Sequence, residues 1–213
     1  MHHECNGVNT VPMNVQYKER DFNKNPLVIG TRGSPLAIAQ AEETRRRLMT
    51  NHSMPQKFFK IRVIKTTGDL VQNRALSEIG GKGLFTKEIE ELLFDRKIDI
   101  AVHSMKDMPT VLPGELTIST VLPREDVRDS FVSIKYKSIN ELPIGATVGT
   151  SSLRRKAQVL SRRADLNVVE FRGNVQTRLK KLKAGVADAT FLACAGLSRL
   201  GMQDLINPIP IHY

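Results

Sequence analysis

The sequence contains little cysteine: two residues, Cys5 and Cys194, among 213. They form no CxxC pair and no disulfide framework, and no His/Cys cluster with metal-ligand spacing accompanies them, so we expect no metal site. Cys194 stands in an apolar run and is interpreted as a small buried hydrophobic residue. This cysteine usage fits a reducing compartment, and we expect the protein in the cytoplasm.

Aromatic residues and long apolar stretches are also scarce. Tryptophan is absent, and aromatic residues make up 5% of the chain. No basic cluster alternates with stacking aromatics and no finger or basic-zipper pattern occurs, so nucleic acid is not an expected partner. No apolar run approaches the ~18 residues of a membrane span, and the N-terminus has no apolar signal segment. Residues 1–21 are polar and aperiodic, which predicts a disordered tail.

What the chain does have is positive charge and an alternating pattern of short strands and helices. The formal net charge of +10 indicates an anionic partner. Strand and helix patterns alternate along the sequence, which predicts an α/β fold with mostly parallel sheets. The polar corner at Arg124 is the predicted boundary between one domain at 22–124 and a second at 125–213. The predicted strands lie at 27–30, 58–65, 98–102, 116–122 and 168–171, with helices starting near 34, 85, 153 and 175.

The most informative corner is Gly149-Thr-Ser-Ser-Leu-Arg-Arg, which follows a short apolar run and opens a helix. Arg154 and Arg155 then lie in the first helical turn, where the helix dipole disfavours cations. Free backbone N–H groups, the Ser151 and Ser152 hydroxyls and two guanidinium groups suit an anion with several carboxylates or phosphates. The spacing predicts a buried helix face made of Leu153, Ala157, Leu160 and Ala164.

Two further corners place arginine at a strand-to-helix turn. In one, Arg172-Gly-Asn leads into a helix with Asn174 as N-cap and Arg178 one turn in. In the other, Arg32-Gly-Ser-Pro leads into a helix with Ser34 as N-cap and a proline at the first helical position. Any one of these corners is compatible with an ordinary turn. Three together favour an anion-binding surface.

The motif His103-Ser-Met-Lys-Asp follows a predicted buried strand, where ligands bind in open α/β sheets. Asp107 is the best candidate for a working carboxylate, although a cap of the following turn is an alternative interpretation. His103 is interpreted as a structural histidine and Asp69 as a turn former. The glycine-rich stretch 80–83 lacks the spacing of a phosphate-binding P-loop, so a hinge or lid is the favoured interpretation.

Seven motifs, taken in order along the chain, resemble those of the porphobilinogen deaminases, also called hydroxymethylbilane synthases. The resemblance runs from about Leu27 to about Gly201. The motifs are Arg32-Gly-Ser-Pro, Gly81-Lys-Gly-Leu-Phe-Thr-Lys-Glu, His103-Ser-Met-Lys-Asp, Arg124-Glu-Asp-Val-Arg-Asp, Gly149-Thr-Ser-Ser-Leu-Arg-Arg, Arg172-Gly-Asn-Val-Gln-Thr-Arg and Ala195-Gly-Leu-Ser-Arg-Leu-Gly.

The resemblance implies a transferase that joins four porphobilinogen molecules into hydroxymethylbilane, with release of ammonia, in tetrapyrrole and haem biosynthesis. It implies two α/β domains resembling type II periplasmic binding proteins around a cleft, a third domain, and a dipyrromethane cofactor held by a thioether to a cysteine of that third domain. Asp107 would be the catalytic acid that stabilises the cationic azafulvene formed as ammonia leaves. The pyrrole carboxylates would be bound by Arg32, Ser34, Ser104, Lys106, Ser151, Ser152, Arg154, Arg155, Arg172, Arg178 and Arg199.

The sequence also departs from the family pattern. It ends at Tyr213, before the third domain, and Cys194 matches no cofactor motif. We therefore expect this chain by itself to carry no cofactor and to be inactive, while binding porphobilinogen and polypyrrole carboxylates as a monomer. The alternative is a non-catalytic anion- or pyrrole-binding module of the periplasmic-binding-protein type. Glu78 stands where many relatives have lysine, which puts one substrate contact in doubt.

Overall fold

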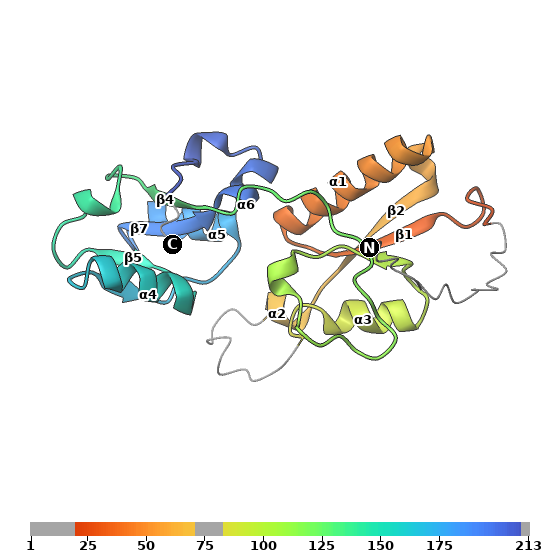
Figure 1. The fold of residues 1–213 in the computed structure, drawn as a ribbon, viewed down its shortest axis with the longest axis horizontal. Helices are drawn as coiled ribbons and strands as arrows, with labels where there is room; N and C mark the ends of the chain where they lie inside the picture. The colour runs from red at the N-terminus through yellow and green to blue at the C-terminus, as the bar shows by residue number, and fades with distance from the viewer. Residues whose placement is uncertain (1–19, 71–82, 210–213) are drawn as a thin grey trace, which may run out of the picture.

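The structure is a computed structural model and describes residues 20–70 and 83–209. It contains two β-sheets, each with its own helices, and the two units lie side by side (Figure 1). We call the unit that carries β1–β3 and α1–α3 lobe 1, and the unit that carries β4–β7 and α4–α6 lobe 2. The segment between β3 and β4, green in Figure 1, connects them. Both lobes mix helices and strands, which confirms the predicted α/β class.

Lobe 1 is built on a fully parallel sheet with strand order β2-β1-β3. Parallel strands need helical crossovers, and the sequence supplies them in alternation. The strands are β1 (Leu27–Arg32), β2 (Phe59–Ile64) and β3 (Ile100–Ala101), and the helices are α1 (Pro35–His52), α2 (Thr67–Leu70) and α3 (Lys87–Phe94).

Lobe 2 has a four-stranded sheet with order β4-β7-β5-β6, in which β4 runs antiparallel to β7 and the other pairs are parallel. The strands are β4 (Asp129–Ser133), β5 (Thr147–Gly149), β6 (Asn167–Val169) and β7 (Ala189–Ala193). The helices are α4 (Leu153–Arg162), α5 (Val175–Lys183) and α6 (Cys194–Arg199). Short 3-10 turns occur at Gln56–Phe58, Met105–Asp107, Ile139–Glu141 and Gln203–Leu205.

The helix starts follow the capping chemistry in the sequence. Ser34 accepts a hydrogen bond from the Ala37 backbone amide, and Ser152 accepts one from that of Arg155. Asn174 accepts hydrogen bonds from both the amide and the hydroxyl of Thr177, each at 2.9 Å. Each cap satisfies one of the donors that a helix leaves without a partner at its N-terminus.

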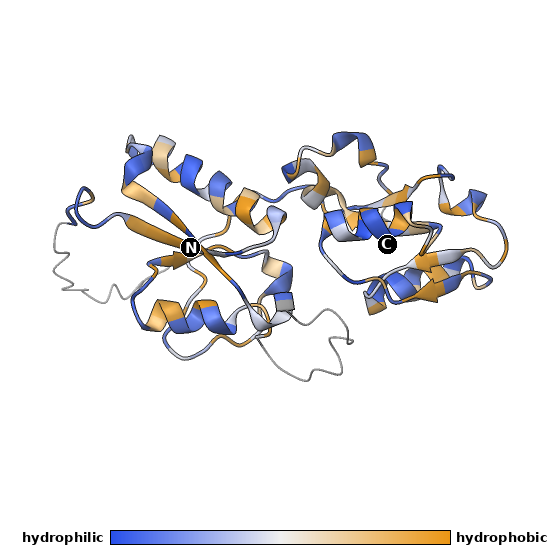
Figure 2. Ribbon diagram, turned by 180° about the vertical axis from the view of Figure 1, so that it is seen from behind, coloured by the Kyte–Doolittle hydropathy of each residue, from blue (hydrophilic) through white to orange (hydrophobic). Residues whose placement is uncertain are grey.

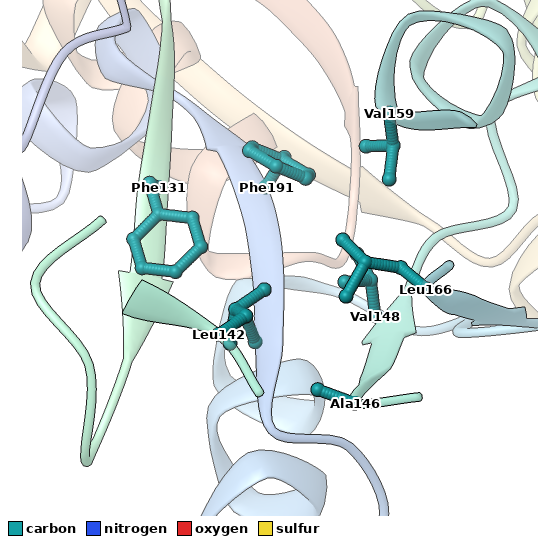
Figure 3. Close-up of a cluster of buried hydrophobic side chains, with 8 residues drawn as sticks. Phe131, Leu142, Ala146, Val148, Val159, Leu166 and Phe191 are labelled. Carbon is teal, nitrogen blue, oxygen red and sulfur yellow. The ribbon is translucent and has the colours of Figure 1, made fainter. Parts of the chain in front are cut away.

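Each lobe has its own apolar core. In lobe 2, buried side chains from β4, β5, β7 and α4 point toward one another (Figure 3), and Phe131 and Phe191 meet edge to face with ring centroids 5.8 Å apart. In lobe 1, Ile29 and Ala41 are fully buried between β1 and α1. The strands are mainly hydrophobic in both lobes, whereas the helices also carry hydrophilic residues (Figure 2). No helix of the described residues is long and apolar enough to cross a membrane.

Gly149, the last residue of β5, lies where the backbone passes too close to another residue for any side chain to fit. A Cβ atom at this position would lie 2.4 Å from the ring of Phe171, which is fully buried. The end of β5 therefore passes directly over that ring. Any side chain at residue 149 would force the two apart and displace the helix start that follows.

Two sequence predictions were wrong. The segment 116–122 forms no strand: it joins neither sheet, and Val121 is 68% exposed, because the segment leads from one lobe to the other. The predicted buried face of α4 is also wrong, since Leu153 is 82% exposed whereas Val159 is buried. The helix is rotated so that Arg155 and Val159, four residues apart, face the sheet.

The predicted tail lies outside the described residues up to residue 19. From Arg20 onward the chain is tied to the first sheet. The Arg20 guanidinium bonds to both carboxylate oxygens of Asp99, at 2.6 and 2.8 Å, and to the Pro26 carbonyl at 2.8 Å. Asp99 in turn accepts the amide of Val28 at the start of β1.

We predict that Asn174→Ala lowers the free energy of unfolding by about 1 kcal/mol, the usual cost of losing a helix cap. Thermal or denaturant unfolding monitored by circular dichroism measures this. Asn51→Ala, which changes an exposed asparagine in the last turn of α1, is the control. Equal stabilities for the two variants would show that the Asn174 cap contributes nothing.

Candidate active site

The two sheets direct the ends of their parallel strands toward one large cleft of about 1710 Å³. In lobe 1, Arg32 at the end of β1, Lys65 just after β2 and His103 just after β3 contribute to its lining. In lobe 2, Ser151 and Arg172 follow β5 and β6. Ligands of open α/β sheets bind beyond the carboxyl ends of strands, so this cleft is the candidate site.

Ten of the twelve predicted site residues line this cleft. The two that do not are Ser152, which caps α4, and Arg154, whose side chain is 61% exposed. Arg32 and Arg155 line the same cleft although they belong to different lobes. The ten are Arg32, Ser34, Ser104, Lys106, Asp107, Ser151, Arg155, Arg172, Arg178 and Arg199.

Arg32, the last residue of β1, contacts two carboxylates of lobe 1. Its Nη2 lies 2.5 Å from Oδ1 of Asp69, and its Nη1 lies 3.5 Å from Oδ2 of Asp107. The guanidinium also stacks over the Phe85 ring, 4.1 Å from its centroid, an arrangement that adds a cation–π attraction. Arg32 is therefore fixed by Asp69 and Phe85 and lies at ion-pair distance from the Asp107 carboxylate.

Asp69 and Phe85 also line the cleft and contact Arg32, although the sequence interpretation favoured a turn former for Asp69 and did not place Phe85 at the site. Burial would raise the pKa of Asp69, but hydrogen bonds from Arg32 and Thr66 outweigh it and lower the pKa. The sequence feature that could have indicated a site role for Asp69 is its position shortly after β2, at the same edge of the parallel sheet as the ends of β1 and β3. Only the strand order places these ends together.

Asp107 ends the 3-10 turn that follows β3, and its side chain is 30% exposed. His103 lies four residues earlier and also lines the cleft. Burial lowers the pKa of His103 and outweighs the attraction of Asp107, which favours the neutral imidazole. Ser104 is held by Gln40 of α1 at 3.0 Å, whereas Lys106 is exposed.

Arg155 and Arg154 both pair with Asp129, the first residue of β4. Arg155 contacts Asp129 through Nε at 3.1 Å and Nη2 at 2.5 Å, and donates from Nη1 to the Phe191 carbonyl at 2.9 Å. Arg154 reaches the same carboxylate at 2.8 Å. The positive charge at the start of α4, where the helix dipole disfavours cations, is thus balanced by the Asp129 carboxylate of β4. The sequence interpretation did not identify this partner.

Two further arginines of lobe 2 have fewer polar partners. Arg178 donates from Nε to the Gly173 carbonyl at 2.9 Å, and burial, together with repulsion from Arg155 and Arg172, lowers its pKa. Nη1 of Arg172 is buried and has no hydrogen-bond partner among the described residues. This part of the cleft therefore has more guanidinium groups than carboxylates to pair with them.

The remaining predicted residues have structural partners of their own. Ser34 caps α1, and Ser151 accepts a hydrogen bond from the Phe171 amide at 3.1 Å. Arg199 pairs with Glu43 of lobe 1 at 3.1 Å. Cys194 is a buried free thiol, as predicted, and its burial raises its pKa. Glu78 and residues 80–82 of the predicted hinge or lid lie outside the described residues.

Within residues 20–70 and 83–209, no group of three or more His, Cys, Asp or Glu side chains could hold a metal ion. The donors in the cleft are instead guanidinium, ammonium and hydroxyl groups, and they share its lining with carboxylates that include Asp69 and Asp107. Such a set suits an organic anion that carries several carboxylates.

The chain is similar in sequence to two curated bacterial porphobilinogen deaminases. Porphobilinogen deaminase of Paracoccus denitrificans (strain Pd 1222) is 67% identical over 179 residues, covering 84% of this chain and 57% of that protein. The same enzyme of Nitrobacter winogradskyi is 59% identical over 176 residues, covering 83% and 56%. The chain thus spans a little over half the length of these curated relatives.

Among solved structures, the chain was matched to the GluR0 ligand-binding core from Nostoc punctiforme and to the methionine-binding protein MetQ. The first is 16% identical with a TM-score of 0.37 and covers 86% of this chain and 76% of that structure. The second is 14% identical with a TM-score of 0.40, covering 85% and 74%.

A family model described as "Porphobilinogen deaminase, dipyromethane cofactor binding domain" matches residues 27–212. That range includes both sheets and every residue assigned to the cleft. This match and the 67% and 59% identities agree with the seven motifs. The chain belongs to the porphobilinogen deaminase family.

Proposed function

We propose that this chain forms the cleft in which porphobilinogen units are joined head to tail into hydroxymethylbilane, with release of ammonia. The protein would then act as a hydroxymethylbilane synthase, a transferase of tetrapyrrole and haem biosynthesis. The observation that carries the proposal is a carboxylate, Asp107, in a cleft lined by guanidinium groups from both lobes. We further propose that the lobes are domains that meet near Arg124, and that the protein works as a monomer in the cytoplasm.

The arginines would bind the acetate and propionate groups of the pyrroles. Each porphobilinogen carries two carboxylates, so a growing chain of pyrroles needs several cationic partners at once. Arg172 and Arg178 are the best placed, since the described residues supply them with few polar partners of opposite charge. A planar guanidinium binds a carboxylate through two parallel hydrogen bonds, which fixes the orientation of the pyrrole as well as its position.

Asp107 would act on the reacting pyrrole. The aminomethyl group must be protonated for ammonia to leave. When the C–N bond of this ammonium group breaks, neutral ammonia takes the bonding electron pair and the positive charge moves to the pyrrole. A fixed carboxylate stabilises that charge and accepts a hydrogen bond from the pyrrole N–H. The next pyrrole then forms the new C–C bond through its free α-carbon and loses the proton that this carbon carried. Arg32 and Asp69 would keep the Asp107 carboxylate in the orientation that this step requires.

The residues present fit the dipyrromethane cofactor of the family. A dipyrromethane carries several carboxylates, and the buried Nη1 of Arg172 is a donor without a partner among the described residues. Arg155, Arg172 and Arg178 would hold its carboxylates, with Ser151 beside them at the cleft wall. When bound, the cofactor supplies the pyrrole end to which substrate units are added. Cys194 is buried among the core residues of lobe 2 and is not an attachment point.

The direct test exchanges the 179 matching residues of the Paracoccus denitrificans enzyme for those of this chain. We expect the chimera to consume porphobilinogen and to form hydroxymethylbilane, measured as uroporphyrin after cyclisation and oxidation. A folded chimera that binds porphobilinogen but produces no pigment above a heat-inactivated control would instead favour a non-catalytic pyrrole-binding module.

We predict that the 213-residue chain binds porphobilinogen and that raising the salt concentration weakens this binding, because guanidinium–carboxylate pairs in an open cleft are partly screened. Titration calorimetry at about 0.05 and 0.5 M NaCl measures the effect. Arg172→Gln should bind about tenfold more weakly at low salt, as expected for loss of a hydrogen bond to a charged group. Arg46→Gln, which removes an exposed charge of α1, should bind as the unmodified chain does. Affinity that is independent of salt and of Arg172 would contradict the proposed anion site.

A further inference from the structure

An ion pair connects the two lobes where α1 and α6 meet. Nε of Arg199, the last residue of α6, lies 3.1 Å from Oε2 of Glu43 in α1. Both side chains are largely shielded from solvent, with 17% of Arg199 and 16% of Glu43 exposed. Shielded pairs are screened less by salt than surface pairs and are more sensitive to the removal of one partner.

Glu43 is held in position by its own helix. Its other carboxylate oxygen, Oε1, accepts hydrogen bonds from Nη2 of Arg47 at 2.8 Å and from Nε at 3.1 Å. Arg47 lies one helical turn further along α1, a spacing at which charged side chains meet. The oxygen that remains, Oε2, is the one that Arg199 contacts.

The two helices also pack closely beside this pair. A Cβ atom at Gly196 would lie 3.5 Å from Cδ2 of Leu36, so α6 approaches the start of α1 at van der Waals distance. Both helices begin just after strands whose ends line the cleft, β1 for α1 and β7 for α6. A change in the position of α1 relative to α6 therefore changes how far the walls of the cleft stand apart.

We propose that Glu43 and Arg199 form a latch that sets the opening of the cleft, and that Arg199 is a positioning residue rather than a ligand of pyrrole carboxylates. The proposal depends on the proposed function only for the identity of the ligand. Arg199 lines the cleft, so direct binding of a carboxylate is the competing role. The two roles make opposite predictions for Glu43→Gln. If the pair is a latch, the loss of the Glu43 carboxylate weakens ligand binding. If Arg199 binds the ligand, removing the Glu43 carboxylate that competes for it leaves binding unchanged or strengthens it.

The distance between the lobes is measurable without any ligand. Spin labels on the exposed residues Lys60 and Lys135, introduced as Lys60→Cys and Lys135→Cys with Cys5→Ser, report it by pulsed electron paramagnetic resonance. We expect one narrow distance distribution for the otherwise unmodified chain. Glu43→Gln and Arg199→Gln should each broaden it. The exchange of Glu43→Arg with both Arg47→Glu and Arg199→Glu, which reverses every charge of the cluster, should restore it.

Glu42→Gln is the matched control, because it removes the same charge from the neighbouring position of α1. Glu42 pairs with Arg45 of its own helix at 2.5 Å, in contrast to the pair that Glu43 makes with lobe 2. Its distance distribution should match that of the unmodified chain. Circular dichroism of each variant separates an altered lobe arrangement from unfolding. An unchanged distribution in folded Glu43→Gln, or failure of the exchange to restore it in a folded protein, would overturn the latch.

Porphobilinogen binding supplies the second measurement. If the closed arrangement is the one that binds, lowering its population lowers the observed affinity in proportion. We expect roughly fivefold weaker binding in Glu43→Gln, near-complete recovery in the exchange variant, and no change in Glu42→Gln. Unchanged or tighter binding in Glu43→Gln would show that Arg199 binds the ligand itself. If porphobilinogen does not bind at all, the proposed function fails while the spin-label distances still test the latch.

Discussion

Replacing Asp107 by asparagine is expected to lower the rate of porphobilinogen consumption by a factor of about 10² to 10³ in the chimera described above, the range found when one electrostatic contact to a transition state is removed. The amide keeps the shape of the side chain and loses the negative charge that faces the developing cation. Binding of porphobilinogen should change much less, because its carboxylates are held by arginines. The rate of ammonia release and the rate of pigment formation should fall together.

Asp95→Asn is the control for this experiment. It removes a carboxylate of lobe 1 that pairs with Lys97 on the surface, outside the cleft. Asp107 is partly exposed, and its contact with Arg32 is longer than that of Asp69, so the Asp107 variant should fold normally. Turnover within a factor of two of the control, in a folded protein, would remove Asp107 from the mechanism.

The sequence was sufficient for features that depend on neighbouring residues. The caps Ser34 and Asn174 follow from short polar side chains placed just before an apolar helical repeat, and both accept the hydrogen bonds expected of them. The strand ends were located well enough that ten of the twelve predicted site residues line one cleft. This works because capping and strand ends are decided within a few residues of the chain.

The sequence did not allow us to predict which carboxylates pair with the arginines of the cleft. Asp69 lies 37 positions from Arg32, Asp129 lies 26 positions from Arg155, and Glu43 lies 156 positions from Arg199. Nothing in the local pattern distinguishes these carboxylates from ordinary surface charges. Their roles depend on strand order and on the packing of the two lobes, which follow from the whole fold.

Both wrong predictions arise from the same limit. Alternation of apolar and polar residues at 116–122 is typical of a strand, but a strand also requires a neighbouring edge for its backbone hydrogen bonds, and this segment joins neither sheet. The apolar repeat that starts at Leu153 suits a buried helix face, but α4 is rotated by the attachment of Arg155 to Asp129 and the Phe191 carbonyl. The contacts of Arg155 and the burial of Val159 define the sheet-facing side of this ten-residue helix, and the local apolar spacing does not reveal it.

Asp129→Asn is expected to destabilise lobe 2 by about 3 kcal/mol, the lower end of the range for breaking a shielded ion pair by removing one partner. Asp129 and Arg155 are 15% and 12% exposed, and Arg154 contacts the same carboxylate. An amide would leave two guanidinium groups close together, at the start of a helix whose dipole already disfavours them. Denaturant unfolding at pH 7 measures the loss, which should appear as a lower midpoint with an unchanged slope.

The difference between the unmodified chain and Asp129→Asn should disappear in acid. Burial alone would raise the pKa of Asp129, but hydrogen bonds and charges from Arg155 and Arg154 outweigh it, so the pKa lies below its ordinary value of 3.8. The ionised carboxylate therefore contributes its full stability above about pH 4, and this contribution falls as the pH drops through the lowered pKa. Asp165→Asn, which removes an exposed partner of Arg163 in the same lobe, should produce a smaller loss at pH 7. A stability difference between the unmodified chain and Asp129→Asn that persists unchanged well below pH 4 would show that the loss comes from side-chain packing and not from the ion pair.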